Sequence, residues 1–219
     1  MPIIELAVHV ISELDFIGAK ATLAARFQCI EPKVTNEGSL ELSEARHPLL
    51  EENLRQAGHN EVVPIGFTLE HARPVMIISG ANAGGKTVVL KTAGLLALMA
   101  LSGLHVPARA ASFPLYRSIL ADIGDRQSLA ANLSTFTAHM ANIREMIEIC
   151  QAPALILLDE VGTGTDPEEG SALGVAIVDH FRHACAAHII ATTHYSGLKM
   201  YAASEEGVLN ASVEFDEKT

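Results

Sequence analysis

The sequence predicts an α/β fold, in which a mixed, mainly parallel sheet is flanked by helices and preceded by one long N-terminal helix. Three observations lead to this prediction. Short apolar runs alternate with helical patterns from about residue 39 onward. Two of these runs, 155–159 and 188–193, are almost continuously apolar, as in interior strands of a parallel sheet that helices cover on both faces. A heptad repeat of apolar residues occupies the segment 3–27.

The N-terminal segment contains no proline and one glycine, and its apolar residues recur in alternating steps of four and three. This spacing predicts one long helix. It fits two arrangements equally well: an amphipathic helix lying on its own domain, or a coiled-coil or lever segment of a longer helical region. The repeating residues are Ile3, Ala7, Val10, Leu14, Ile17, Ala21 and Ala24.

A break at Pro32, Asn36 and Gly38 separates this helix from the rest of the chain. Beyond it, apolar runs bounded by turn residues predict strands, and a 3.6-residue periodicity predicts helices. The predicted strands are 39–42, 62–69, 75–79, 118–122, 155–159, 188–193 and 209–215. The predicted helices are 85–101, 135–150 and 167–182, with a short helical turn at 197–203.

A glycine-rich turn lies between the apolar run 75–79 and an alanine- and leucine-rich helical segment. It has the pattern GxxxxGKT from Gly80 to Thr87, which is typical of loops that bind phosphate. Its glycines allow the backbone to turn N–H groups toward an anion, and the positive end of the following helix points to the same place. Lys86 would reach the β- and γ-phosphates of ATP, and the Thr87 hydroxyl would bind Mg²⁺.

Two adjacent acids, Asp159 and Glu160, end another apolar run. A phosphate-loop enzyme needs a carboxylate at such a strand end to hold Mg²⁺, and a neighbouring acid can polarise the attacking water. We therefore assign Asp159 to the metal and Glu160 to the water. Without the phosphate loop, two solvated acids at a strand terminus would be a comparable explanation.

His194 directly follows the apolar run 188–193. A histidine at a strand end is more often structural than functional. Its position after the phosphate loop and the acidic pair favours a second role, a hydrogen bond to the γ-phosphate that distinguishes ATP from ADP.

Two helix starts carry polar side chains with more than one interpretation. Ser134 or Thr135 begins the helix 135–150 and is suited to cap it, but the same helix start can present a hydroxyl and a positive dipole end to a phosphate. A chain's own ATP already occupies its phosphate loop, so this second anion site would serve a neighbouring subunit. Asp166 is predicted to cap the next helix, and the polar loop 162–165 before it is suited to a dimer interface.

Five motifs follow one another along the chain: RHPLL at Arg46–Leu50, GANAGGKT at 80–87, LSTF at Leu133–Phe136, LLDEVGTGTDPEEG at 157–170 and TTHYSGLK at 192–199. Together they closely resemble the ATPase domain of the MutS family, from about residue 40 to the end of the chain. GTDPEEG and the terminal NASVEFD resemble the MutS-II, or Smr-type, branch. The N-terminal helix is similar to the tail of that family's lever helices.

The resemblance implies a P-loop NTPase of the ABC type, which works as a face-to-face homodimer with two shared sites for ATP or ADP and Mg²⁺. It implies that Lys86, Gln127, Glu160 and His194 are catalytic, and that Thr87 and Asp159 hold Mg²⁺, partly through water. The nucleotide-binding residues would be Gly80, Ala81, Asn82, Ala83, Gly84, Gly85, Lys86, Thr87 and Val88, with Ser134 and Asp166 supplied in trans. Ala81 stands where the family usually has proline.

The resemblance also divides the chain into two parts. Residues 1–35 would be the tail of a lever or core region, and residues 36–219 would be the ABC-type ATPase domain. Both would belong to a longer protein, whose DNA-binding domains lie outside this chain. The Smr nuclease-like domain found in MutS-II proteins would lie outside it as well.

Charge and composition limit the partners of this part of the protein. The net charge of −11 has the wrong sign for a surface that neutralises duplex phosphates, so we expect other domains to bind DNA. No apolar run approaches the roughly 20 residues of a membrane span, and the N-terminal residues MPIIELAVHV lack the basic n-region of a secretory signal. We therefore expect a soluble, cytoplasmic protein with no membrane partner.

Three classes of function remain. The first is an ATPase engine for a MutS-II protein that binds branched, recombining or mismatched DNA and suppresses recombination. The second is the engine of a factor that rescues collided ribosomes. The third, a structural dimerisation module, would not need Lys86, Glu160 and His194. Binding of the full-length protein to branched DNA or to collided ribosomes would separate the first two.

Overall fold

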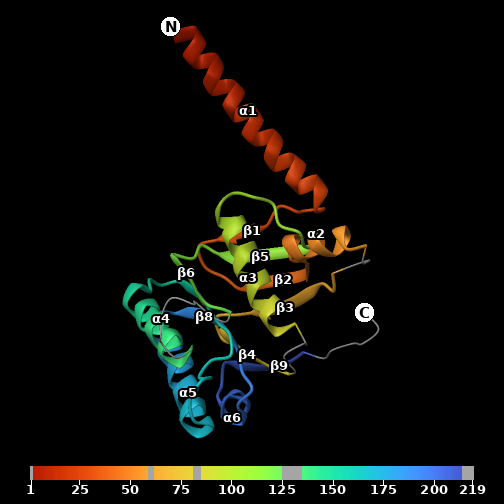
Figure 1. The fold of residues 1–219 in the computed structure, drawn as a ribbon. Helices are drawn as coiled ribbons and strands as arrows, with labels where there is room; N and C mark the ends of the chain where they lie inside the picture. The colour runs from red at the N-terminus through yellow and green to blue at the C-terminus, as the bar shows by residue number, and fades with distance from the viewer. Residues whose placement is uncertain (1, 59–61, 81–84, 125–134, 214–219) are drawn as a thin grey trace.

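The computed structural model describes residues 2–58, 62–80, 85–124 and 135–213. Within these ranges the chain forms a five-stranded sheet and a four-stranded sheet, with helices on both faces of the larger one (Figure 1). The helices are α1 (Pro2–Arg26), α2 (Pro48–Gln56), α3 (Lys86–Leu101), α4 (Thr135–Ile149), α5 (Pro167–Ala184) and α6 (Ser196–Ser204). The strands are β1 (Lys33–Thr35), β2 (Leu40–Ala45), β3 (Ile65–Leu69), β4 (Val75–Ser79), β5 (Ala110–Pro114), β6 (Ser118–Asp122), β7 (Ala154–Leu158), β8 (Ala187–Thr192) and β9 (Val208–Ser212).

The larger sheet has the order β6-β7-β8-β4-β9, and all four of its strand pairs are parallel. The smaller sheet has the order β1-β5-β2-β3 and is mixed, because β1 runs parallel to β5 while β2 runs antiparallel to both β5 and β3. The predicted α/β class is therefore confirmed, with the mixed and the parallel pairing divided between two sheets.

Alternate residues of the larger sheet face two separate apolar clusters. In β4, Met76 and Ile78 pack with α3 and with the smaller sheet, while Val75 and Ile77 pack with the cluster of α4, α5 and α6. Strands β4, β7 and β8 are buried along their whole length, as expected for interior strands covered on both faces. Every strand end that carries a predicted site residue is therefore held inside a packed core.

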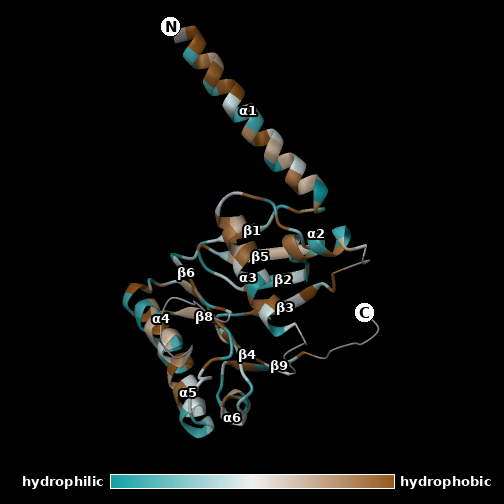
Figure 2. Cartoon of the chain, viewed as in Figure 1, coloured by the Kyte–Doolittle hydropathy of each residue, from teal (hydrophilic) through white to brown (hydrophobic). Residues whose placement is uncertain are grey.

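The N-terminal helix α1 projects from the body of the molecule, and apolar residues occur along its whole length (Figures 1 and 2). It does not lie on its own domain, which was one of its two predicted arrangements. Its base is fixed by an Arg26–Glu52 ion pair of 2.6 Å and by Arg46, which donates to the carbonyl oxygen of Phe27 at 2.6 Å. The large apolar residues of α1 that are 45–82% exposed are Ile3, Ile4, Leu6, Val8, Val10, Ile11, Leu14, Phe16 and Ile17.

Three elements were not predicted from the sequence. Helix α2 is short and mostly polar, and it begins where Pro48 takes its first turn and the His47 ring accepts a hydrogen bond from the Leu50 N–H. Strand β1 has only three residues, all exposed, and β5 ends in a proline, so neither carries a strand pattern of its own. The predicted strand 62–69 begins only at Ile65.

No helix within the described ranges is long and apolar enough to cross a membrane.

Candidate functional site

The phosphate-loop strand β4 ends at Ser79, and α3 begins at Lys86, as the sequence predicted to within one residue. Gly80 has a φ of 139°, and a Cβ atom there would lie 2.7 Å from the carbonyl oxygen of Val213. Gly85, the residue before α3, is left-handed with a φ of 82°. Only glycine adopts both conformations without strain, so the two ends of the predicted loop have the backbone that a tight phosphate-binding turn requires.

Lys86 is buried at the first position of α3, with 2% of its surface exposed. Its Nζ atom donates a hydrogen bond of 2.7 Å to the carbonyl oxygen of Gly80, which closes the loop at its base. Buried ammonium groups are stabilised by nearby anions. The position is therefore suited to the phosphate-binding role predicted for Lys86.

Thr87 and Asp159 are joined directly, although 72 residues separate them in the sequence. The Thr87 hydroxyl donates to one carboxylate oxygen of Asp159 at 2.8 Å, and the Thr192 hydroxyl donates to the other at 2.7 Å. Asp159 is 7% exposed, so both oxygens lie in a largely dry environment. The two predicted metal ligands thus lie side by side, and their hydroxyl and carboxylate oxygens are the hard donors that Mg²⁺ prefers.

A magnesium ion bound by Thr87 and Asp159 would need further ligands. Within the described ranges, no group of three His, Cys, Asp or Glu side chains could hold a metal ion. Mg²⁺ usually binds proteins through one or two carboxylates and completes its shell with water and substrate phosphates. Thr87 and Asp159 therefore fit a magnesium ion that arrives with a nucleotide.

Glu160 has a left-handed backbone, with a φ of 49°. This conformation is uncommon for a residue with a long side chain and turns the chain sharply at the end of β7. The Glu160 N–H donates to the Thr192 hydroxyl at 2.7 Å, and its Oε1 atom lies 2.9 Å from Nε2 of His194. The side chains of Glu160 and His194 are 38% and 35% exposed, so water can reach this pair.

The parallel sheet explains why these residues meet. Strand β8 lies between β7, which leads to the two acids, and β4, which leads to the phosphate loop. The carboxyl ends of all three strands lie at the same edge, which is where open α/β sheets bind their ligands. Lys86, Thr87, Asp159, Glu160 and His194 are therefore brought together by topology.

Thr192 also belongs to the site, although the sequence alone did not predict it. It is fully buried, and its hydroxyl group bridges Asp159 and Glu160. A threonine at the end of a strand that is buried along its whole length is the available signal, because a buried hydroxyl group needs hydrogen-bond partners.

Asp166 caps α5, as predicted. Its carboxylate accepts hydrogen bonds from the N–H groups of Glu168 at 2.9 Å and Glu169 at 3.4 Å, and the residue is exposed. Val88 lies in the first turn of α3. The remaining predicted site residues, Ala81, Asn82, Ala83, Gly84, Gln127 and Ser134, lie outside the described residues.

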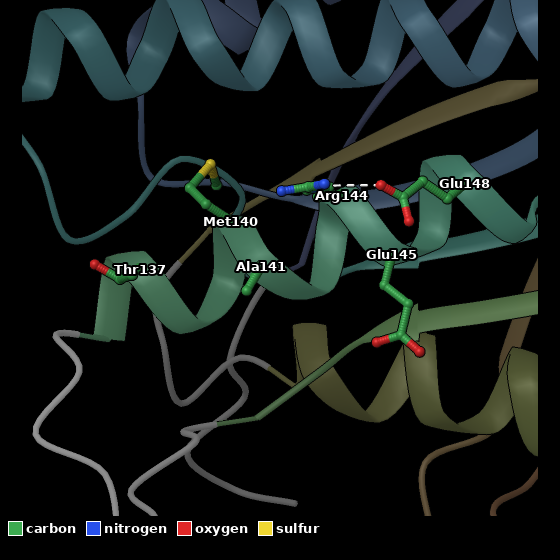
Figure 3. A pocket seen from close by; sticks show the side chains of 6 residues that line it. All are labelled: Thr137, Met140, Ala141, Arg144, Glu145 and Glu148. Atoms are coloured by element: carbon green, nitrogen blue, oxygen red, sulfur yellow. Dashed lines mark hydrogen bonds and ion pairs between the residues drawn. The ribbon is translucent and has the colours of Figure 1, made fainter.

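A separate hollow of about 500 Å³ lies along α4 (Figure 3). Its described lining comes from α4 alone, and an ion pair of 3.0 Å joins two of its residues, Arg144 and Glu148. Of the described residues assigned to phosphate, metal or water, none lines it. The lining residues are Thr137, Met140, Ala141, Arg144, Glu145 and Glu148.

Comparison with known protein families gives a match to the model of MutS domain V over residues 76–219. The matched segment begins in β4 and includes every residue assigned above to phosphate, metal or water.

Comparison with curated proteins gives relatives named Endonuclease MutS2. The protein of Clostridium botulinum (strain Langeland) is 49% identical over 212 residues, which are 96% of this chain and 26% of the relative. The protein of Halalkalibacterium halodurans is 48% identical over 213 residues, or 97% of this chain and 26% of the relative. The protein of Alkaliphilus metalliredigens is 46% identical over 211 residues. The chain thus spans about a quarter of the length of these relatives.

Proposed function

The chain belongs to the MutS family and is of the MutS2 type, and on that premise we propose that it binds and hydrolyses ATP as the ABC-type engine of a longer DNA-binding protein. One observation carries this proposal. Lys86, Thr87, Asp159, Glu160 and His194 lie at one sheet edge, and hydrogen bonds join Thr87 to Asp159 and Glu160 to His194. A module that only held two chains together would not need this arrangement.

Each residue has a distinct role in the proposed reaction. Lys86 would hold the β- and γ-phosphates, and Thr87 and Asp159 would hold Mg²⁺, partly through water. The ion, when bound, neutralises charge on the phosphate oxygens. Glu160 accepts a proton from the attacking water, whose oxygen bonds to the γ-phosphorus as the bond between that phosphorus and the bridging oxygen breaks. The proton then passes to the inorganic phosphate, which leaves Glu160 ionised for the next turnover. The products are ADP and inorganic phosphate.

The contact between His194 and Glu160 gives the histidine two tasks in this scheme. It orients the Glu160 carboxylate toward the water through their contact, and it would donate a hydrogen bond to the γ-phosphate when ATP is bound. Because ADP lacks this phosphate, the pair would respond to the nucleotide state of the site.

We propose further that each site is shared between two copies of the chain. Ser134 and Asp166 of one copy would contact the nucleotide held by the phosphate loop of the other, and Gln127 would approach the reacting phosphate within its own chain. The exposure of Asp166 and the open side of the Glu160–His194 pair support this arrangement, because both leave room for a neighbour.

For the whole protein we propose that DNA is the partner and that other domains bind it. The relatives are named endonucleases, which favours nucleic acid over a ribosome-only role. The net charge of −11 supports the proposal that other domains bind DNA, since an acidic domain repels a phosphate backbone. Branched or recombining DNA remains the proposed substrate class.

The direct test is Glu160→Gln, which keeps the shape of the side chain but removes its ability to accept a proton. We expect ATP binding near the wild-type level, turnover lowered by roughly 100-fold or more, and accumulation of an ATP-bound dimer. Equilibrium binding, phosphate release and size-exclusion chromatography measure the three quantities. Glu41→Gln, at an exposed position of β2, is the matched control and should leave all three unchanged. Normal turnover in Glu160→Gln would remove Glu160 from the mechanism.

A further inference from the structure

Asp122 lies at the end of β6, beside the strand that carries the magnesium-binding carboxylate. In the parallel register, Asp122 is opposite Leu158, and the Asp159 N–H donates to the carbonyl oxygen of Asp122 at 2.8 Å. Asp122 is 5% exposed. Its backbone is therefore fixed directly to the residue proposed to hold the metal.

The Asp122 carboxylate contacts two side chains of α4. One oxygen lies 2.5 Å from Nδ1 of His139, and the other accepts a hydrogen bond of 2.8 Å from the Asn142 side chain. His139 and Asn142 are three positions apart and so lie on one face of the helix. Together these three residues form a polar cluster, which we call the Asp122 cluster, between the Asp159 backbone and α4.

A second contact joins the same two regions. Gly164, in the loop after Glu160, has a φ of 93°, and a Cβ atom there would lie 3.0 Å from Cβ of Phe136 and 3.2 Å from its N atom. The loop therefore lies directly against the first turn of α4. The first half of α4 is thus held from two sides, by the last residue of β6 and by the loop that follows β7.

Stability alone is a weak explanation for the Asp122 cluster. Buried ionic pairs often contribute little, because desolvation offsets their attraction, and apolar residues could join α4 to the sheet equally well. Directional hydrogen bonds differ from apolar contacts because they fix the register and orientation of the helix. An error of about 1 Å in such placement can cost catalysis roughly 100-fold.

We propose that Asp122 and His139 are positioning residues, which set the start of α4 relative to Asp159 so that this helix start can act on the nucleotide bound by a second copy of the chain. The proposal rests on the shared ATP site proposed above and adds two residues to it. A substitution of His139 should therefore impair the ATP site of the second copy and should leave the phosphate loop of its own chain intact.

Mixing of inactive variants tests this statement in the full-length protein. His139→Leu removes the hydrogen bond to Asp122 and is expected to lower turnover by roughly 10- to 100-fold while ATP binding to its own loop is retained. Lys86→Ala loses its own ATP site but keeps an intact α4. In a mixed dimer, the phosphate loop of His139→Leu meets the intact helix of Lys86→Ala, so one working site is restored.

Three mixtures separate the outcomes. Ser134→Ala mixed with Lys86→Ala is the positive control for a shared site. His139→Leu mixed with Lys86→Ala should regain activity to the same extent, whereas His139→Leu mixed with Ser134→Ala should stay inactive because both subunits carry the same kind of defect. Recovery also shows that His139→Leu is folded.

Two contrary results distinguish failure of the positioning role from failure of the shared site. If the control recovers but His139→Leu with Lys86→Ala does not, His139 serves its own chain and the positioning role is wrong, while the shared site stands. If the control itself stays inactive, the shared site of the proposed function fails and the positioning role fails with it.

A conservative variant checks the chemistry of the contact. The side-chain amide nitrogen of asparagine can take the place of the histidine Nδ1 atom, so His139→Asn should keep the hydrogen bond to Asp122 and restore most of the turnover lost in His139→Leu. Equal loss in His139→Asn and His139→Leu would show that the ring volume matters and not the hydrogen bond, which would overturn the proposal.

Discussion

The Thr192 hydroxyl group connects the two acids of the site, since it donates to Asp159 and accepts from the Glu160 N–H. Thr192→Val keeps the shape of the side chain but removes both hydrogen bonds inside a fully buried position. We expect the free energy of unfolding to fall by roughly 1–3 kcal/mol, because a buried N–H group loses its partner. ATP turnover should fall as well, since Glu160 is no longer held in its left-handed conformation.

Urea unfolding and phosphate-release assays measure the two effects of Thr192→Val. Thr192→Ser retains the hydroxyl group and serves as the control, with turnover close to wild type. Equal turnover in both variants would mean that the bridge does not contribute to the site.

His188, at the beginning of β8, makes stability depend on pH. Burial, with a smaller contribution from the nearby His71, lowers the pKa of His188 from 6.5 to about 4, and its Nδ1 atom lies 2.7 Å from the hydroxyl group of the buried Tyr116. As the pH falls below 6.5, the unfolded chain binds a proton that the folded chain does not bind until the pH approaches 4. This contribution to stability is therefore complete above pH 6.5 and is lost between pH 6.5 and 4, by about 3 kcal/mol in total.

His188→Asn keeps a neutral partner for the Tyr116 hydroxyl but cannot titrate. The free energy of unfolding should then depend less steeply on pH between 6.5 and 4 than in wild type, as measured by urea unfolding at a series of pH values. His105→Asn, at an exposed position, is the matched control. A slope unchanged by His188→Asn would exclude His188 as its source.

At the residue scale, the sequence was sufficient to predict which groups with a local motif lie together at the sheet edge, while their roles in binding and hydrolysis stay predictions. Lys86, Thr87, Asp159 and Glu160 were predicted because the phosphate loop and the strand-end acids each have a recognisable pattern. Asp122 and Thr192 were missed as contributors to the site. Thr192 contacts Asp159, which lies 33 positions earlier in the sequence, and Asp122 contacts His139 and Asn142, which lie 17 and 20 positions later. No local sequence pattern spans such separations.

Two glycines allow the loop after Glu160 to lie against α5. A Cβ atom at Gly170 would meet the Gly162 carbonyl oxygen and would also lie 3.1 Å from the Tyr195 ring. Gly170→Ala should lower the free energy of unfolding by about 2 kcal/mol, as overpacking does elsewhere, and should reduce turnover by displacing the loop. Urea unfolding and phosphate release measure both effects.

The control for Gly170→Ala is Gly18→Ala, which also lies within a helix. Nothing lies within 4 Å of a Cβ atom at Gly18, so the change should be neutral or should stabilise α1 by roughly 0.5–1 kcal/mol. Similar losses in the two variants would mean that the glycine contact has no special role.

At the scale of elements, strands and helices with strong patterns were predicted and those defined by tertiary pairing were not. Strands β4, β7 and β8 are continuous apolar runs, and α3 and α5 have clear starts. In contrast, β1 exists only through its pairing with β5, and β5 through its pairing with β2. Such strands contain little sequence information of their own, because their partners supply their hydrogen bonds.

At the scale of the whole molecule, the net charge predicts that this chain does not bind duplex DNA by itself. With a net charge of −11, the isolated chain should show no measurable binding to duplex DNA at about 0.15 M salt, while the full-length protein should bind. Fluorescence anisotropy with a labelled duplex checks both. Micromolar binding by the isolated chain would show that this domain itself contacts DNA.

The projection of α1 has a geometric consequence. Its 25 residues extend about 37 Å from a base that is tied to the body by Arg26 and Arg46. A rotation of the body by about 5° would then move the far end of this rod by about 3 Å, if the helix stays straight. Any rotation of the body is thereby magnified at the far end of α1, so a probe at Ile3 should register such a rotation better than one at the sheet.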